Sequence, residues 1–152
     1  MDQLERVLQL FHENYNCAQS VFAACAEDEG LGEAERLALA SAFGGGMAGQ
    51  GEVCGALTGA LMALGAARGK ELAADPVGAR KALYEQARQI TQSFRLAHGS
   101  ILCRELTGCS LDTEEGHHAF QERDLRKNLC DKLVVFAVGQ ATQAIGAPRD
   151  QN

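Results

Sequence analysis

This sequence is poor in aromatic residues, proline and long apolar runs, and each shortage excludes a class of protein. Its 152 residues include no tryptophan, two prolines and only 5% aromatic residues. Strand cores favour β-branched and aromatic side chains, whereas abundant alanine and glycine suit closely packed helices. The longest apolar run, residues 54–67, is shorter than the roughly 20 residues that span a bilayer. We therefore predict an all-α protein without membrane insertion.

The chain also lacks an excess of positive charge. Its net charge is −6, and binding to nucleic acid requires a basic face. The one basic cluster, residues 123–127, is interpreted as a solvated loop or helix start. Residues 1–6 have neither a basic region nor an apolar run, so we expect no signal peptide and a cytoplasmic location. In that compartment, spaced cysteines are more often metal ligands or redox centres than structural disulfides.

Common catalytic and cofactor motifs are missing as well. No CxxC pair occurs, which excludes a zinc ribbon and a thioredoxin-type motif, and no CxxCH occurs, so covalent haem is not expected. There is no nucleophile elbow for serine catalysis. A phosphate-binding GxxxxGK[ST] loop is also missing, and no nucleotide is expected.

Apolar periodicity and capping residues predict a compact bundle of helices in a single domain, 1–152. Asn16 and Gln19 form a capping-box pattern that starts one helix, which Gly30 would end. Asp75 followed by Pro76 starts a long helix that Gly99 closes. The segment 107–127 is not assigned. The expected helices cover residues 3–13, 16–30, 33–43, 52–68, 75–99, 101–106 and 129–145.

A glycine-rich loop, residues 44–51, leads into the most apolar helix, 52–68. Such a loop requires unusual backbone angles or a close backbone approach. Gly55 and Gly59 lie four residues apart and share a face, which favours close helix packing. A loop of this kind before a helix N-terminus also resembles an anion cradle, so Gly51, Gly55 and Gly59 are candidate cofactor-binding residues.

Four cysteines fall where helices are expected to begin: Cys17, Cys54, Cys103 and Cys130. At a helix N-terminus, unpaired N–H groups and the helix dipole favour the thiolate, which ligates metals and attacks disulfides. The simpler interpretation is that each is a small core residue. Their repeated placement instead predicts one thiol site, formed where four helix starts converge.

The other candidate groups receive weaker assignments. Cys25 falls inside a helix and Cys109 in a loop, so both are interpreted as bystanders. His98, near the end of the long helix, could supply a ligand or a proton, but it more simply stabilises the helix C-terminus. His117 and His118 are expected at the surface.

These cysteine segments resemble the C_GCAxxG_C_C family, a group of small redox-active proteins named for their cysteine pattern. The matching residues are Asn16–Ser20, the glycine-rich loop with Cys54–Ala60, Cys103–Gly108 and Cys130, over about residues 14–144. The resemblance implies that Cys17, Cys54, Cys103 and Cys130 are the family's cysteines. A related domain occurs in split-Soret cytochromes beside an iron–sulfur cluster, which implies a cluster here, without the haems.

We therefore expect a cytoplasmic redox protein that uses these cysteines to hold an iron–sulfur cluster or as exchangeable thiols, with Cys54 central. It would exchange electrons with a redox partner that the sequence does not identify. One alternative is a structural zinc site that holds helix ends together. Another is an anion-binding module without redox chemistry. Two very apolar helices in one small domain also predict a homodimer.

Overall fold

The computed structural model describes residues 1–147, so residues 148–152 of the expected 1–152 domain lie outside the described residues. The described part is all-α, as predicted, and its single β interaction is an isolated antiparallel bridge between Val53 and Leu102. None of the described helices is long and apolar enough to cross a membrane. The helices are α1 (Gln3–His12), α2 (Cys17–Cys25), α3 (Glu33–Leu39), α4 (Gly55–Ala67), α5 (Gly69–Ala74), α6 (Pro76–His98), α7 (Cys103–Thr107), α8 (Glu114–Glu122) and α9 (Asp131–Gly146), with a 3₁₀ turn η1 (Ser41–Phe43) and a π-helical turn η2 (Arg126–Cys130).

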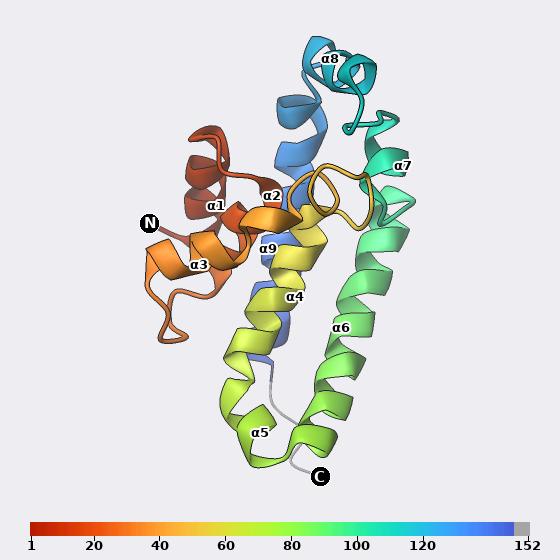
Figure 1. Ribbon diagram of the computed structural model, residues 1–152. Coiled ribbons are helices and arrows are strands. Elements are labelled where there is room, and N and C mark those ends of the chain that lie inside the picture. Colours follow the sequence, from red (N-terminus) through yellow and green to blue (C-terminus); the bar gives the residue numbers. More distant parts are fainter. Residues whose placement is uncertain (148–152) are drawn as a thin grey trace.

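The helix α4 is the centre of the bundle, as its apolar composition predicted. It packs against α2, α6 and α9, and in Figure 1 α4 and α6 run side by side with α9 behind α4. Leu57 and Leu64 on α4 are almost completely buried, as are Phe94 on α6 and Val134 on α9. Each such side chain stabilises the fold by roughly 1.5–3 kcal/mol through the removal of apolar surface from water.

Small residues allow α2 and α4 to approach closely. A Cβ atom added at Gly59 would lie 2.7 Å from the carbonyl oxygen of Ala18 and 3.0 Å from the Cβ of Val21. One added at Gly55 would lie 3.1 Å from the amide nitrogen of Ala18 and 3.2 Å from the Cβ of Cys17. Both glycines therefore bring the start of α4 directly against the start of α2.

Most capping predictions are confirmed. Asn16 accepts a hydrogen bond from the amide of Gln19, and the Gln19 side chain accepts one from the Asn16 amide. Asp75 caps α6, whose first residue is Pro76, and Gly99 ends it in the left-handed conformation. The expected end of α2 at Gly30 was wrong, because α2 stops at Cys25 and a turn follows.

The segment 107–127, which the sequence left unassigned, contains α8, with Thr113 as its N-cap. The expected helix start at Cys130 was wrong, because the π-helical turn η2 precedes it and runs into α9. Asn128 does not cap this helix. Its side-chain amide donates instead to the carbonyl of Arg123, at the end of α8. Cys130 therefore has hydrogen-bonded helical backbone on both sides.

Candidate functional site

All four cysteines of the predicted set line one cavity of about 190 Å³. They come from the start of α2, the residue before α4, the start of α7 and the junction of η2 with α9. Cys17 is partly exposed and the other three are buried. The rest of the wall is mostly apolar, with a few polar groups: Phe11, Asn16, Gly45, Gly55, Leu106, Thr107, Leu111, His117, Phe120, Arg126 and Leu133.

The isolated antiparallel bridge of Val53 with Leu102 holds Cys54 and Cys103 at diagonal positions, one residue to either side of the bridge. The amide of Cys54 donates to the carbonyl of Ile101 at 2.8 Å. The amide of Cys103 donates to the carbonyl of Glu52 at 2.7 Å. These bonds connect two segments about 50 residues apart in the chain, so sequence spacing alone could not reveal the pair.

The glycine-rich loop passes directly over this bridge. Residues 45–49 all have positive φ, including Met47 at 65° and Ala48 at 55°. A Cβ at Gly46 would lie 2.6 Å from the amide nitrogen of Glu52 and 2.8 Å from the Cβ of Cys103, so only glycine fits there. The amides of residues 47–52 donate to nearby loop carbonyls. They are therefore not directed at a bound anion, as an anion cradle would require.

Cys17 and Cys130 both line the cavity, and each thiol shifts the pKa of the other. Their interaction raises the pKa of Cys17 well above its ordinary value, and burial adds to the effect. The same interaction lowers the pKa of Cys130, and the positive charge of Arg126 lowers it further, while burial and the charge of Asp131 act in the opposite direction. The pair therefore holds one proton on Cys17 and a negative charge on Cys130 under conditions in which an isolated cysteine is protonated.

Arg126 is the functional residue that sequence reasoning missed. Its guanidinium donates to the carbonyls of Phe11 at 2.6 Å and Tyr15 at 2.7 Å. The guanidinium carbon also lies 3.8 Å from the centre of the Phe11 ring. The interpretation of residues 123–127 as solvated was therefore wrong for Arg126, which lines the cavity. An arginine held between carbonyls and an aromatic ring carries a fixed charge beside the thiol pair.

The other two cavity thiols are held in the neutral form. Burial raises the pKa of Cys54 to about 11, even though hydrogen bonds from the amides of Ala56 and Leu57 favour its thiolate. Burial also raises the pKa of Cys103 to about 12, and the nearby cysteines add to that effect. The expectation that all four helix starts favour thiolates was therefore wrong, because burial outweighs the helix N-terminus at these two positions.

The remaining candidates lie around this cavity or away from it. Of the three candidate glycines, only Gly55 lines it. Gly59 packs against α2, and a Cβ at Gly51 would lie 2.9 Å from the Cβ of Arg104. Burial raises the pKa of Cys25 to about 12, and this thiol is not among the cavity-lining residues. His98 is also absent from the cavity wall; its ring packs edge-on between Phe94 and Phe136.

The four cavity thiols form a donor set of the kind that holds metal centres in proteins. Four thiols around one cavity match an iron–sulfur cluster in the number and kind of its donors. A single tetrahedral ion such as zinc requires ligands that converge on one point. Among residues 1–147, no three His, Cys, Asp or Glu side chains are arranged to hold one metal ion. The present arrangement therefore does not fit a structural zinc site.

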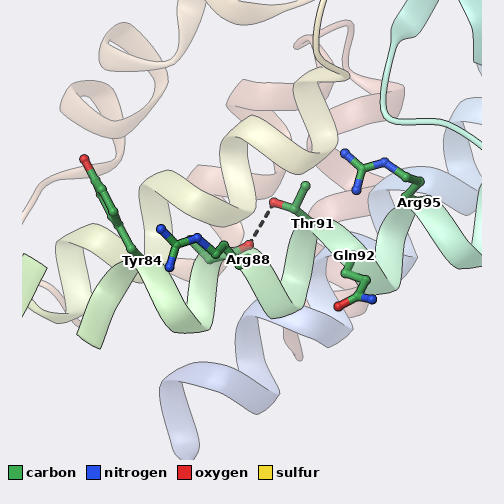
Figure 2. A pocket seen from close by; sticks show the side chains of 6 residues that line it. Tyr84, Arg88, Thr91, Gln92 and Arg95 are labelled. Atoms are coloured by element: carbon green, nitrogen blue, oxygen red, sulfur yellow. Dashed lines mark hydrogen bonds between the residues drawn. The ribbon is translucent and has the colours of Figure 1, made fainter. Parts of the chain in front are cut away.

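A second hollow lies on the outer face of α6, and it is shallow, open and free of cysteine. Figure 2 shows Tyr84, Arg88, Thr91, Gln92 and Arg95 along it. The guanidinium carbon of Arg88 lies 5.8 Å from the centre of the Tyr84 ring. The Thr91 hydroxyl donates to the Ala87 carbonyl at 2.8 Å, within its own helix. This groove contains no thiol, so the reactive groups are concentrated in the cysteine cavity.

Comparison with known proteins gives one match. The model of the family described as "Putative redox-active protein (C_GCAxxG_C_C)" matches residues 15–144. This range includes all four cavity cysteines and Arg126. No curated protein and no solved structure gives a significant match to the chain.

Proposed function

The chain belongs to the C_GCAxxG_C_C family, and from this premise we propose that it performs thiol–disulfide exchange with the pair Cys17 and Cys130. The observation that carries the proposal is that Cys17, Cys130 and Arg126 line the same cavity; the pKa of Cys17 is raised and that of Cys130 is lowered by the interaction between the two thiols. A stabilised thiolate next to a second thiol can accept the proton of that thiol as its sulfur attacks a disulfide, and can then resolve the mixed disulfide. Cys54, the residue favoured from sequence, becomes a neutral neighbour of the pair.

The two thiols divide the chemistry between them. Cys17, the partly exposed member, meets an external disulfide, and its proton moves to the neighbouring Cys130 thiolate as its sulfur attacks. A bond forms between Cys17 and one substrate sulfur, and the other substrate sulfur leaves as a thiolate. The Cys130 sulfur then attacks Cys17, and its proton goes to the second leaving thiol. The substrate gains two electrons, and Cys17 and Cys130 become a disulfide.

Trapping of the first intermediate tests this division. We expect Cys130→Ser, treated with glutathione disulfide, to accumulate a glutathione adduct on Cys17, because the proposed resolving thiol of Cys130 has been removed. Cys17→Ser should form no comparable adduct on the buried Cys130. Mass spectrometry of the intact protein and its peptides measures both. An adduct on Cys130 alone would contradict the assignment of Cys17 as the residue that meets the substrate.

Arg126 should determine the pH range of the activity. The exchange rate is expected to rise with pH as the pair loses its first proton, with a midpoint below the ordinary cysteine pKa of 9.0. In Arg126→Gln the midpoint should move to higher pH and the rate at pH 7 should fall several-fold, because less thiolate is present. Arg126→Lys should retain much of the rate, and Lys127→Gln, at an exposed neighbour, should leave the profile unchanged. An identical profile for Arg126→Gln would refute the role of this charge.

An iron–sulfur cluster is the second candidate, and the observation in its favour is the set of four thiols around one cavity. Cys17, Cys54, Cys103 and Cys130 would hold it, and it would supply one-electron transfer. Elemental analysis of protein purified anaerobically without added metal distinguishes the two candidates. We expect iron and zinc well below one atom per chain. Near-stoichiometric iron would favour the cluster, and stoichiometric zinc would restore the structural alternative.

We also propose a cytoplasmic homodimer that exchanges electrons with a redox partner. Support for self-association comes from exposed apolar side chains on α6, where Val77 is 69% exposed, Tyr84 51% and Leu96 79%. Light scattering measures the mass directly, and the mass of one chain would refute the dimer.

A further inference from the structure

A fifth thiol lies next to the cavity cysteines and is not part of the sequence pattern that defines them. Cys109 is buried immediately after α7, one residue beyond Gly108, which ends that helix. The Thr107 hydroxyl connects its backbone to that of Cys103. This oxygen lies 2.7 Å from the carbonyl oxygen of Cys103 and 3.1 Å from the amide nitrogen of Cys109. One hydroxyl therefore connects the backbones of the two cysteine residues.

An arginine also contacts this thiol. The Arg123 guanidinium donates to the sulfur of Cys109 at 3.9 Å and to the carbonyl of Thr107 at 3.2 Å. Arg123 and Arg126, whose charge lowers the pKa of Cys130, both belong to the short basic cluster between α8 and α9. One segment therefore places a positive charge near each of two separate thiols. A charged donor at a sulfur stabilises the thiolate that leaves when a disulfide is attacked.

Cys103 connects the two arrangements. It lines the cavity with Cys17 and Cys130, and its backbone is held to that of Cys109 through Thr107. The charges of Cys54, Cys130 and Cys109 each raise the pKa of Cys103, which is consistent with a position between the cavity and the fifth thiol.

We propose that Cys103 and Cys109 form a second redox pair, which exchanges its disulfide with the Cys17–Cys130 pair across the cavity. This inference rests on the proposed thiol–disulfide function. The sequence analysis interpreted Cys109 as a bystander. In this proposal Cys109 instead has a role, because the Cys103–Cys109 disulfide would store two oxidising equivalents inside the protein. Arg123 then acts as a positioning residue for the leaving thiolate.

The exchange is reversible, and its steps balance. In the direction that reduces the second pair, the Cys130 thiolate attacks the Cys103 sulfur, the Cys103–Cys109 bond breaks, and Cys109 leaves as a thiolate beside Arg123. The Cys17 sulfur then attacks Cys130, and the Cys130–Cys103 bond breaks. The proton of Cys17 passes to Cys103, whose pKa of about 12 favours the neutral thiol. Two electrons have moved from the first pair to the second.

Peptide mapping provides a direct test, because trypsin separates the thiols concerned. Cleavage after Arg104 places Cys103 in peptide 96–104 and Cys109 in peptide 105–123, while Cys130 lies in peptide 128–132. The reduced full-length protein is treated anaerobically with excess glutathione disulfide, quenched at intervals and digested without reductant. We expect peptide 96–104 linked to 105–123, together with Cys17 linked to 128–132. The Cys25→Ala variant removes the second cysteine from the Cys17 peptide and should give the same map.

The outcomes separate the two proposals. A Cys17–Cys130 link without a Cys103–Cys109 link overturns the second pair and leaves the proposed function intact. The absence of a Cys17–Cys130 link overturns the proposed function. In Cys17→Ser and Cys130→Ser, the Cys103–Cys109 link should form at least about tenfold more slowly, because oxidation enters through the first pair. Formation at the wild-type rate in both variants would refute exchange between the pairs.

Arg123 is tested by the same mapping, with Cys109 in peptide 105–126 in the Arg123→Gln variant because the cleavage site after residue 123 is lost. Arg123→Gln should slow formation of the Cys103–Cys109 link while leaving the Cys17–Cys130 link unchanged, and Arg123→Lys should restore it. Equal slowing of both links in Arg123→Gln would indicate a general structural defect and would overturn the positioning role.

Discussion

Replacing Cys130 with serine is expected to lower the rate of thiol–disulfide exchange by at least about 100-fold. Two functions are lost together in this variant. The thiolate that accepts the proton of Cys17 disappears, and so does the sulfur that resolves the mixed disulfide. The measurement is the rate of reduction of glutathione disulfide by the reduced protein, followed as thiol release under anaerobic conditions.

The matched control for this experiment is Cys25→Ser, which removes a buried thiol outside the cavity wall. It should keep the wild-type rate, and circular dichroism should show equal helicity in both variants. If Cys130→Ser retained more than about a tenth of the wild-type rate while Cys54→Ser lost activity, the reactive pair would have been assigned incorrectly. The sequence-based choice of Cys54 would then be favoured.

The second large effect is expected on stability, at the contact between α2 and α4. Gly59→Ala should lower the free energy of unfolding by about 1–3 kcal/mol, because the added Cβ would lie 2.7 Å from the Ala18 carbonyl oxygen. Alanine is otherwise the better helix former by roughly 1 kcal/mol, so the steric conflict must outweigh a favourable change. Urea unfolding followed by circular dichroism provides the measurement.

Gly65 supplies the control in the same helix. A Cβ at Gly65 would meet no atom within 4 Å, so Gly65→Ala should stabilise the protein by up to about 1 kcal/mol. The opposite signs of the two changes are the critical result. If Gly59→Ala were as stabilising as Gly65→Ala, the close approach of α2 and α4 would be refuted.

The helices themselves were largely predictable because their signals are local. The Asn16–Gln19 capping box and the Asp75–Pro76 start each involve residues within one turn of helix, and both were found as predicted. The apolar composition of α4 indicated its central position. The prediction failed at Cys130, where Asn128 resembles a cap but bonds to the end of the preceding helix.

The candidate site was predictable only as a set of residues. The sequence identified Cys17, Cys54, Cys103 and Cys130, and all four line one cavity. It could not distinguish the protonation states of these cysteines. Several of them have a similar position at a helix start, but the burial and the neighbouring charges that set their pKa values differ from one cysteine to the next. It also assigned Arg126 to solvent, since a charged residue in a basic cluster has no local signal for burial.

The sequence by itself determined the all-α class, the main helix starts, the need for glycine in the loop at 44–51 and the set of cysteines, because these follow from local backbone preferences and residue chemistry. The tertiary structure alone decided which cysteines are neighbours and which of them carries the charge. Cys17 and Cys130 are separated by more than 100 residues, and they meet only because α2 and α9 pack together. The physical reason is that pKa depends on burial, hydrogen bonds and nearby charges, and in this protein those come from segments distant in the chain.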